Sequence, residues 1–382
     1  MKRSVDRILT MHAGSLPRPD DLWAMVNAKA RGQGYDADAL AARTESAVAE
    51  VVRKQIDSGM DSINDGEFGK SNFSNYARER IAGFEEREPK PGDVPTTIFG
   101  RDMVEFPGYF TGAGRSTVGL NPRRFFCTGP LSYKGHDAVR TDIANFRAGL
   151  VGVTEQEPFL PAVAPGTIEH WLWNEHYASD EEYLFAIADA MHEEYQAIVD
   201  AGFVLQIDDP DLADAWQIQS QMSVAEYKKF AELRIDALNH ALRGIPVESV
   251  RFHMCWGSYH GPHKHDIPLE DIIDIVLKAN AQAYSIEASN VRHAHEWRVW
   301  QNVKLPEGKI LTPGVVGHAS DFVEHPELIA ERLVRYAGLV GRENVMAGTD
   351  CGLGTRIDGD IVWAKFEAMA EGARIASAAL WP

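Results

Sequence analysis

The segment from Arg251 to Gly257 contains a histidine and a cysteine at a spacing that suits metal binding. It continues an alternating run with the two-residue period of a β-strand, so His253 and Cys255 point to the same face. At about 3.3 Å of rise per residue, their Cα atoms lie roughly 6.5 Å apart. An imidazole nitrogen and a thiolate at that separation can bind one zinc at about 2.0 to 2.3 Å. Taken alone, the pair is also compatible with a buried thiol beside a hydrogen-bonded histidine.

Two further candidate ligands come at the ends of other predicted strands. A short apolar segment from Ala283 ends at Glu287, and a run from Asn344 reaches Cys351 just before a glycine-containing turn. In a barrel of parallel strands, all carboxyl ends open onto one mouth. Three protein ligands and one exchangeable position are typical of a catalytic zinc site. The predicted metal ligands are His253, Cys255, Glu287 and Cys351, although Glu287 could instead be an acceptor that orients a ligand.

The elements that must position these residues alternate between strands and helices along the chain. Such alternation predicts a parallel sheet, and eight strands predict a (βα)8 TIM barrel in one domain over residues 1–382. A segment near 76–124, rich in proline, glycine and charge, interrupts the rhythm and is expected to be an insertion over the barrel mouth. The predicted strands are 10–19, 60–69, 124–130, 203–210, 249–257, 283–287, 309–316 and 344–353.

Composition excludes several classes of function. The chain has 382 residues, of which 45% are apolar, and a net charge of −18, which argues against binding to nucleic acid or anionic membranes. No apolar run is long enough to span a bilayer, and the N-terminus lacks the apolar segment of a secretory signal. Three cysteines make no disulfide framework. We therefore expect a cytoplasmic protein, either a monomer or a homo-oligomer, with its thiols reduced.

The strand-end motifs resemble those of a known family. His253-Met254-Cys255, Ser285-Ile286-Glu287 and Thr349-Asp350-Cys351-Gly352-Leu353 resemble the zinc motifs in the catalytic half of cobalamin-independent methionine synthase. The resemblance implies a (βα)8 barrel with zinc held by His253, Cys255 and Cys351, and Glu287 as a ligand that a substrate thiol can displace. Further matches, in the family's order, are Ala13-Gly14-Ser15-Leu16-Pro17, Asp65-Gly66-Glu67, Thr128-Gly129-Pro130 and Gln206-Ile207-Asp208-Asp209-Pro210.

The same resemblance implies a pocket for homocysteine. Ser15, Glu67 and Asp208 would hold its amino and carboxylate groups, because a buried ammonium needs carboxylates to offset its lost hydration. We include Asp209 in this acidic set, although it stands where the family usually has glutamate. These acids suit an ammonium and would repel a bare sulfonate.

The length of the chain leaves the reaction open. The full synthase has a second, N-terminal barrel, and 382 residues leave no room for it. Single-barrel relatives include core methionine synthases that take methyl from a corrinoid protein, and epoxyalkane:coenzyme M transferases, which the loop 256–265 resembles. The leading prediction is methyl transfer from a methylfolate or methylcorrinoid to the zinc-bound thiolate of homocysteine. The alternatives are thiol addition to an epoxide, with Arg18, Lys70 or Arg356 binding the sulfonate of coenzyme M, and a non-catalytic zinc scaffold.

Either reaction needs a proton donor for the leaving nitrogen or the opening epoxide oxygen. The candidates in predicted turns are His12, Tyr259, His260 and His318, and the sequence does not rank them. The histidines of the loop 260–265 are irregularly spaced, so we expect a solvated lid there and not a second metal cluster. Cys127 has no partner motif and is expected to be a small core residue.

Overall fold

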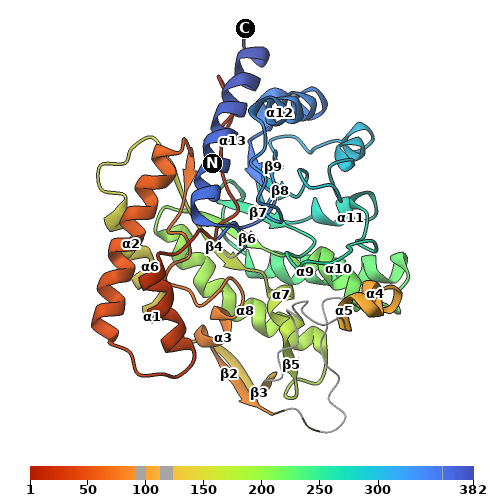
Figure 1. The fold of residues 1–382 in the computed structure, drawn as a ribbon. Coiled ribbons are helices and arrows are strands. Elements are labelled where there is room, and N and C mark those ends of the chain that lie inside the picture. Colours follow the sequence, from red (N-terminus) through yellow and green to blue (C-terminus); the bar gives the residue numbers. More distant parts are fainter. Residues whose placement is uncertain (89, 91–99, 112–123, 355) are drawn as a thin grey trace.

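The computed structural model describes residues 1–88, 90, 100–111, 124–354 and 356–382. Its centre is a parallel sheet in the order β1-β4-β6-β7-β8-β9-β10. The strands are β1 (Ser62–Ile63), β4 (Glu157–Val163), β6 (Val204–Asp208), β7 (Val250–Met254), β8 (Ala283–Ile286), β9 (Ile310–Val316) and β10 (Gly348–Thr349). The predicted barrel class is confirmed, because this sheet curls into a TIM-barrel-like arrangement with helices outside it (Figure 1).

The N-terminal segment lies between the first and last strands of this sheet. Thr10 forms a parallel bridge with Ala347, which precedes β10. On its other side, the carbonyl of Thr10 accepts hydrogen bonds from the amides of Asp61 and Ser62 at 3.1 and 3.0 Å. The segment therefore takes the place of the strand predicted to open the fold, and it joins the two edges of the sheet.

Helices cover the outside of the sheet. Figure 1 shows α2 and α6 side by side on one flank, with α10 and α11 on the other. Several helices begin at a residue whose side chain caps the N-terminus, such as α10, where Ser223 and Glu226 form a capping box. The helices are α1 (Asp20–Ala30), α2 (Ala37–Asp57), α3 (Tyr76–Arg80), α4 (Gly100–Glu105), α5 (Pro107–Thr111), α6 (His136–Gly149), α7 (Pro165–Trp171), α8 (Asp180–Asp200), α9 (Asp211–Ile218), α10 (Val224–Ala241), α11 (Leu269–Val276), α12 (Pro326–Val340) and α13 (Gly359–Leu380), with short 3-10 turns η1 (Val247–Ser249), η2 (Glu296–Gln301) and η3 (Arg342–Asn344).

The third predicted barrel strand is wrong. The segment 124–130 lies in β3 (Arg124–Tyr133), which pairs antiparallel with β2 (Ile81–Arg87) and parallel with β5 (Leu172–Asn174) in a separate sheet. This small sheet projects at the bottom of Figure 1. The third strand of the barrel is β4 instead. Its Pro158 and Pro161 made it hard to recognise as a strand from the sequence, because proline removes a backbone donor. Cys127 is buried in β3, as expected of a core residue.

The predicted insertion near 76–124 contains α3, β2, α4 and α5 among its described residues, and the sheet it starts extends past it to β5. Helix α4 packs on α9, which follows barrel strand β6. Arg101 of α4 donates to the carbonyls of Trp216 and Gln219 at 2.8 and 3.0 Å. The insertion therefore reaches the loops at the carboxyl ends of the strands, as predicted.

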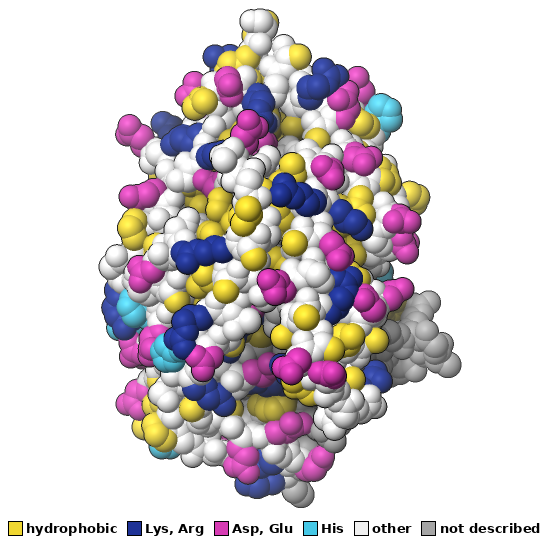
Figure 2. Space-filling view, turned by 90° about the vertical axis from the view of Figure 1, so that its left-hand side faces the viewer, with side chains coloured by type: hydrophobic (Ala, Val, Ile, Leu, Met, Phe, Trp, Pro, Cys, Tyr) yellow, Lys and Arg dark blue, Asp and Glu magenta, His cyan; other side chains and the backbone are white. Residues whose placement is uncertain are grey.

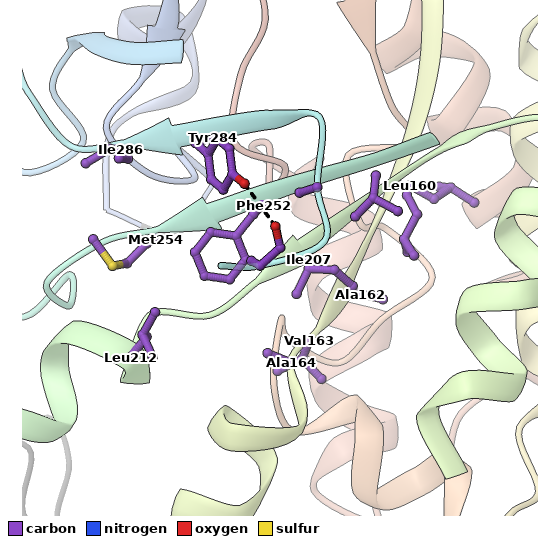
Figure 3. Packing of buried hydrophobic residues seen from close by; sticks show 14 of the residues in the cluster. Leu160, Ala162, Val163, Ala164, Ile207, Leu212, Phe252, Met254, Tyr284 and Ile286 are labelled. Atoms are coloured by element: carbon purple, nitrogen blue, oxygen red, sulfur yellow. Dashed lines mark hydrogen bonds between the residues drawn. The ribbon is translucent and has the colours of Figure 1, made fainter. Parts of the chain in front are cut away.

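The alternation within β7 explains how the site residues are aimed. Phe252 and Met254 belong to the apolar core, where they lie among the side chains of neighbouring strands and Leu212 of α9 (Figure 3). Arg251 and His253 alternate with them and point to the other face of the strand. The guanidinium of Arg251 is fully buried there and donates to Gln206 Oε1 at 2.9 Å.

The outer surface carries interspersed charges of both signs. Figure 2 shows basic and acidic side chains alternating over the face that includes α1 and α2. Arg43, for example, bridges Asp21 and Glu50 at 2.6 and 3.0 Å. Within the described ranges, every helix is too short or too polar to cross a membrane.

Candidate metal centre and substrate pocket

Three side chains from two strand ends meet in one group. His253 is the penultimate residue of β7, Cys255 directly follows that strand, and Cys351 lies two residues after β10. One ligand atom from each lies within 4.8 Å of the other two, and the sulfur atoms of Cys255 and Cys351 are 3.6 Å apart. His253 and Cys255 are buried, whereas Cys351 is partly exposed. The predicted convergence of these three residues is therefore present in the fold.

The donor atoms of this group fit a metal ion. Nδ1 of His253 lies 3.3 Å from Ser285 Oγ, whereas Nε2 is buried and has no hydrogen-bond partner among the residues that the structure describes. A metal-binding histidine commonly shows this pattern, with one nitrogen oriented by the protein and the other left for the ion. The hydrogen bond between the two sulfur atoms lowers the pKa of Cys351 well below its ordinary value and raises that of Cys255. Ser258 Oγ also donates to Cys351 at 3.5 Å.

Glu287, the fourth predicted ligand, lies outside this group of three. Its carboxylate is fully buried and accepts from Arg292 Nη2, which lies 3.1 Å from each oxygen. His318 Nδ1 and His293 Nε2 lie 3.6 and 3.8 Å from its two oxygens. Burial raises the pKa of Glu287 to about 8, although the cationic Arg292 opposes that rise. Metal binding by Glu287 stays a prediction.

A cavity of about 270 Å³ opens beside the metal-binding group. Three of the four residues predicted to hold the substrate line it, namely Ser15, Glu67 and Asp208. His253, Cys255 and Cys351 line the same cavity, so the candidate metal ligands and the carboxylates of Glu67 and Asp208 face one space. Its other lining residues include Arg18, Trp23, Phe73, Trp171, Asp211, Asp214, Tyr259 and Arg356.

The turn that carries Glu67 requires unusual backbone conformations. Glu67 has a left-handed φ of 62°, and its amide donates to Asp65 Oδ1 at 2.9 Å. Gly14, with φ of 129°, packs against it, because a Cβ at that position would lie 2.5 Å from Glu67 Oε1. Arg18 supports the turn by donating to the carbonyls of Glu67 and Lys70 at 2.7 and 2.6 Å. The Glu67 carboxylate is therefore held in place by its surroundings.

Among the described residues, neither Glu67 nor Asp208 forms a salt bridge, although the charge of Lys70 opposes the rise in the pKa of each. Burial raises the pKa of Glu67 to about 8 and that of Asp208 to about 6. Asp208 also accepts from Gln206 Nε2 at 2.7 Å, which orients it. A buried carboxylate with a raised pKa gains stability when a cation arrives. The wall formed by Glu67 and Asp208 is thus suited to a ligand ammonium.

Asp209 lies outside the cavity. Its carboxylate is buried and accepts from Thr167 Oγ1 of α7 at 3.0 Å. Adjacent residues at a strand end point to opposite sides, so Asp208 and Asp209 face different surroundings. A contact of Asp209 with substrate stays a prediction, and the cavity lining does not include this residue. Asp211 and Asp214 line the cavity instead, and the acidic run after the β6 strand was the sequence signal for them.

Of the four candidate proton donors, only Tyr259 lines the cavity. His12 is buried, with Nε2 2.8 Å from Gln55 Oε1 and Nδ1 accepting from the Gly14 amide at 3.2 Å. Burial lowers the pKa of His12 to about 3, so it is neutral and its two nitrogens are engaged. His260 is exposed, and His318 is buried beside Glu287.

The histidine-rich loop 260–265 is tied to carboxylates. His263 is buried, and its nitrogens lie 3.1 Å from Asp266 and 3.0 Å from the carbonyl of Tyr259. Lys264 and His265 both pair with Glu105 of α4. The loop is therefore tied to Asp266 on one side and to Glu105 on the other. The loop is more firmly held than the predicted solvated lid.

Comparisons with known proteins agree with this geometry. Residues 142–374 match the family described as "Cobalamin-independent synthase, Catalytic domain". A methionine synthase of Thermococcus kodakarensis is 26% identical over 95% of this chain and 91% of its own length. One from Sulfolobus acidocaldarius is 25% identical over 92% and 88%.

Solved structures show the same fold. A B12-independent methionine synthase from Shewanella, in complex with selenomethionine, superposes with a TM-score of 0.74 at 20% identity, covering 98% of this chain and 99% of that one. A protein from Listeria monocytogenes described as a putative B12-independent methionine synthase gives 0.65 at 18% identity, covering 96% and 98%. The family match spans more than half of the chain, and its strand-end motifs lie where the fold requires them. The chain belongs to the cobalamin-independent methionine synthase family, in its catalytic domain.

Proposed function

We propose that this protein is a zinc-dependent methyltransferase that methylates the sulfur of homocysteine to give methionine. The observation that carries the proposal is the placement of His253, Cys255 and Cys351 in the same cavity as Glu67 and Asp208. The family match and the methionine synthase relatives support it.

Zinc is the metal we propose for the group of three. One imidazole and two thiolates form a donor set that suits zinc, and three protein ligands leave a position for substrate. When bound there, zinc would supply a thiolate nucleophile at neutral pH, where a free thiol of pKa about 8.5 is mostly protonated. The chain's own contribution is to fix His253 through Ser285 and to keep both cysteines at the cavity wall.

The acidic wall orients the amino acid part of the substrate. Glu67 and Asp208 would bind the ammonium of homocysteine, and Ser15 and Arg356 are placed along the cavity to bind its carboxylate. The carboxylates in the cavity disfavour the sulfonate of coenzyme M. Of the cations considered for that sulfonate, Lys70 donates to the carbonyl of Pro161, and Arg18 donates to two backbone carbonyls. The homocysteine reaction is therefore the better supported of the two.

Three aromatic residues among those that line the cavity favour a flat methyl donor. They are Trp23, Phe73 and Trp171, and aromatic faces stack well on a heteroaromatic ring. Methylfolate is the donor we propose, with a methylcorrinoid as the alternative. Tyr259 would then donate a hydrogen bond or proton to the departing nitrogen, because it is the candidate that lines the cavity.

Calorimetry with the zinc-loaded protein tests this proposal. L-homocysteine is expected to bind with release of about one proton, measured by comparing two buffers of different ionisation enthalpy. L-homoserine, which lacks the thiol, is the matched control ligand and should bind without proton release. Binding of coenzyme M in preference to homocysteine would contradict the proposal and favour epoxide opening. Zinc retention with no thiol binding would favour a non-catalytic scaffold.

A further inference from the structure

The residues around Glu287 form a site that binds its carboxylate away from the three candidate metal ligands, and we call it the receiving site. Arg292 contacts both oxygens of Glu287 at 3.1 Å, in a pairing that engages one guanidinium nitrogen. The side chain of Glu287 is fully buried, so solvent does not share in stabilising its charge. In this structure the Glu287 carboxylate contacts Arg292 and lies outside the group formed by His253, Cys255 and Cys351.

Arg292 is itself fixed by other acceptors. Its Nη1 donates to Asp266 Oδ2 at 3.4 Å, and its Nε donates to Asn290 Oδ1 at 3.3 Å. Asn290 is anchored in turn by Asp350, which accepts from its amide at 3.1 Å and from its side-chain Nδ2 at 2.9 Å. Asp350 directly precedes Cys351. The position of the guanidinium is therefore tied to the segment that carries a metal-binding cysteine.

His293 and His318 complete the receiving site, and His318 Nδ1 lies 3.6 Å from Glu287 Oε1. His293 lies between Asp266 and Glu296, at 3.1 and 2.8 Å, and stacks on Trp256 with ring centroids 3.9 Å apart. These contacts hold its Nε2 3.8 Å from Glu287. Glu296 and Trp256 are buried, and Asp266 and Asn290 are half-buried and hydrogen-bonded, so this side of Glu287 is a built site rather than a chance contact.

The charges of the metal centre supply a reason for such a site. Two cysteine thiolates balance the charge of one Zn²⁺, so the centre has no net charge before a further anion joins it. A substrate thiolate and the Glu287 carboxylate together would leave two uncompensated negative charges in a buried space, which is costly. Only one of the two anions is readily accommodated at the metal at a time.

We propose that Arg292 is a positioning residue that receives Glu287 when the substrate sulfur binds zinc, so that Glu287 exchanges between the metal and Arg292. This rests on the proposed function. With zinc bound, this exchange would break one oxygen–zinc contact and form one sulfur–zinc contact, and the proton of the thiol would go to the solvent buffer. Arg292 thereby sets the balance between metal retention and thiol binding without contacting the substrate.

The test compares Arg292→Gln, Glu287→Gln and the double variant, with Arg298→Gln of η2 as a matched arginine control. In Arg292→Gln, Glu287 loses its alternative partner and stays on zinc. Zinc should bind about tenfold tighter and homocysteine about tenfold weaker, each equivalent to about 1.4 kcal/mol. The double variant should restore both affinities to those of Glu287→Gln. Arg292→Lys keeps a cation there and should restore most of the homocysteine affinity.

Zinc affinity is measured by competition with a chelator, and homocysteine affinity by calorimetry. Unchanged affinities for both in Arg292→Gln would overturn the proposal. Equal loss of homocysteine binding in the single and double variants would also overturn it, because Arg292 would then act independently of Glu287. If the wild-type protein failed to bind homocysteine, the proposed function would fail, but the zinc affinities would still decide the role of Arg292. Should Arg292→Gln not fold, Arg292→Lys is measured in its place: it should show both shifts in the same directions at a smaller size, and wild-type affinities for zinc and homocysteine in Arg292→Lys would overturn the proposal.

Discussion

Cys351→Ser is expected to lose zinc and with it methyl transfer. A hydroxyl is a much poorer zinc donor than a thiolate, and this variant leaves only His253 and Cys255 of the group of three. Loss of a residue that only orients a ligand typically costs about 10- to 100-fold in metal affinity. Removal of a ligand should therefore weaken zinc binding by more than about 100-fold. Metal content after dialysis, chelator competition and the rate of methionine formation measure the effect.

The matched control is Cys127→Ser. Cys127 is also a buried cysteine, but it lies in β3 of the small sheet and donates to the carbonyl of Gly129 at 3.4 Å. Its replacement should leave zinc content and activity at wild-type levels, apart from a small change in stability. Full zinc and full activity in Cys351→Ser would contradict the assignment of this cysteine to the metal centre. Equal zinc loss in both variants would indicate a folding defect.

Glu67→Gln and Asp208→Asn are expected to reduce kcat/KM for homocysteine by about 30- to 5000-fold. Each change keeps the shape of the side chain but removes a charge that faces the substrate ammonium in a buried cavity. Truncating one partner of a buried charge pair costs about 2–5 kcal/mol, which corresponds to that range of affinity. Most of the loss should appear in KM, because the contact exists before and during the reaction. Initial rates over a range of homocysteine concentrations measure it.

Asp209→Asn is the control for both carboxylates. Asp209 is buried like its neighbour Asp208, but its partner is Thr167 and it lies outside the cavity. We expect KM for homocysteine to stay within about twofold of wild type, with the effect of the change seen in thermal stability instead. A KM increase in Asp209→Asn as large as that in Asp208→Asn would show that the substrate reaches both sides of this strand end. Unchanged KM in the Glu67 and Asp208 variants would refute the acidic wall.

The metal-binding group was predictable because its geometry is local to each strand. The two-residue period placed His253 and Cys255 on one face, and parallel strands in a barrel bring Cys351 to the same mouth. The third barrel strand was misassigned because Pro158 and Pro161 interrupt the pattern of β4, whereas apolar β3 resembles a barrel strand.

The remaining site residues depend on contacts that strand and helix patterns do not encode. The sequence shows that His12 lies near a turn, but not that Gln55 and Gly14 engage its nitrogens. Asp211 and Asp214 reach the cavity only because α9 begins directly after β6. The role proposed for Arg292 depends on its contact with Glu287 within the loop after β8 and on its contact with Asp266 from the preceding loop.

X-ray absorption at the zinc edge tests most directly whether the homocysteine thiol binds a zinc held by this group. It is recorded for the zinc-loaded protein with and without saturating L-homocysteine. We expect zinc bound by one nitrogen and two sulfur ligands from His253, Cys255 and Cys351, with one further sulfur neighbour when homocysteine is added. Sulfur coordination that stays the same at saturating homocysteine, or zinc surrounded only by oxygen and nitrogen, would contradict this expectation.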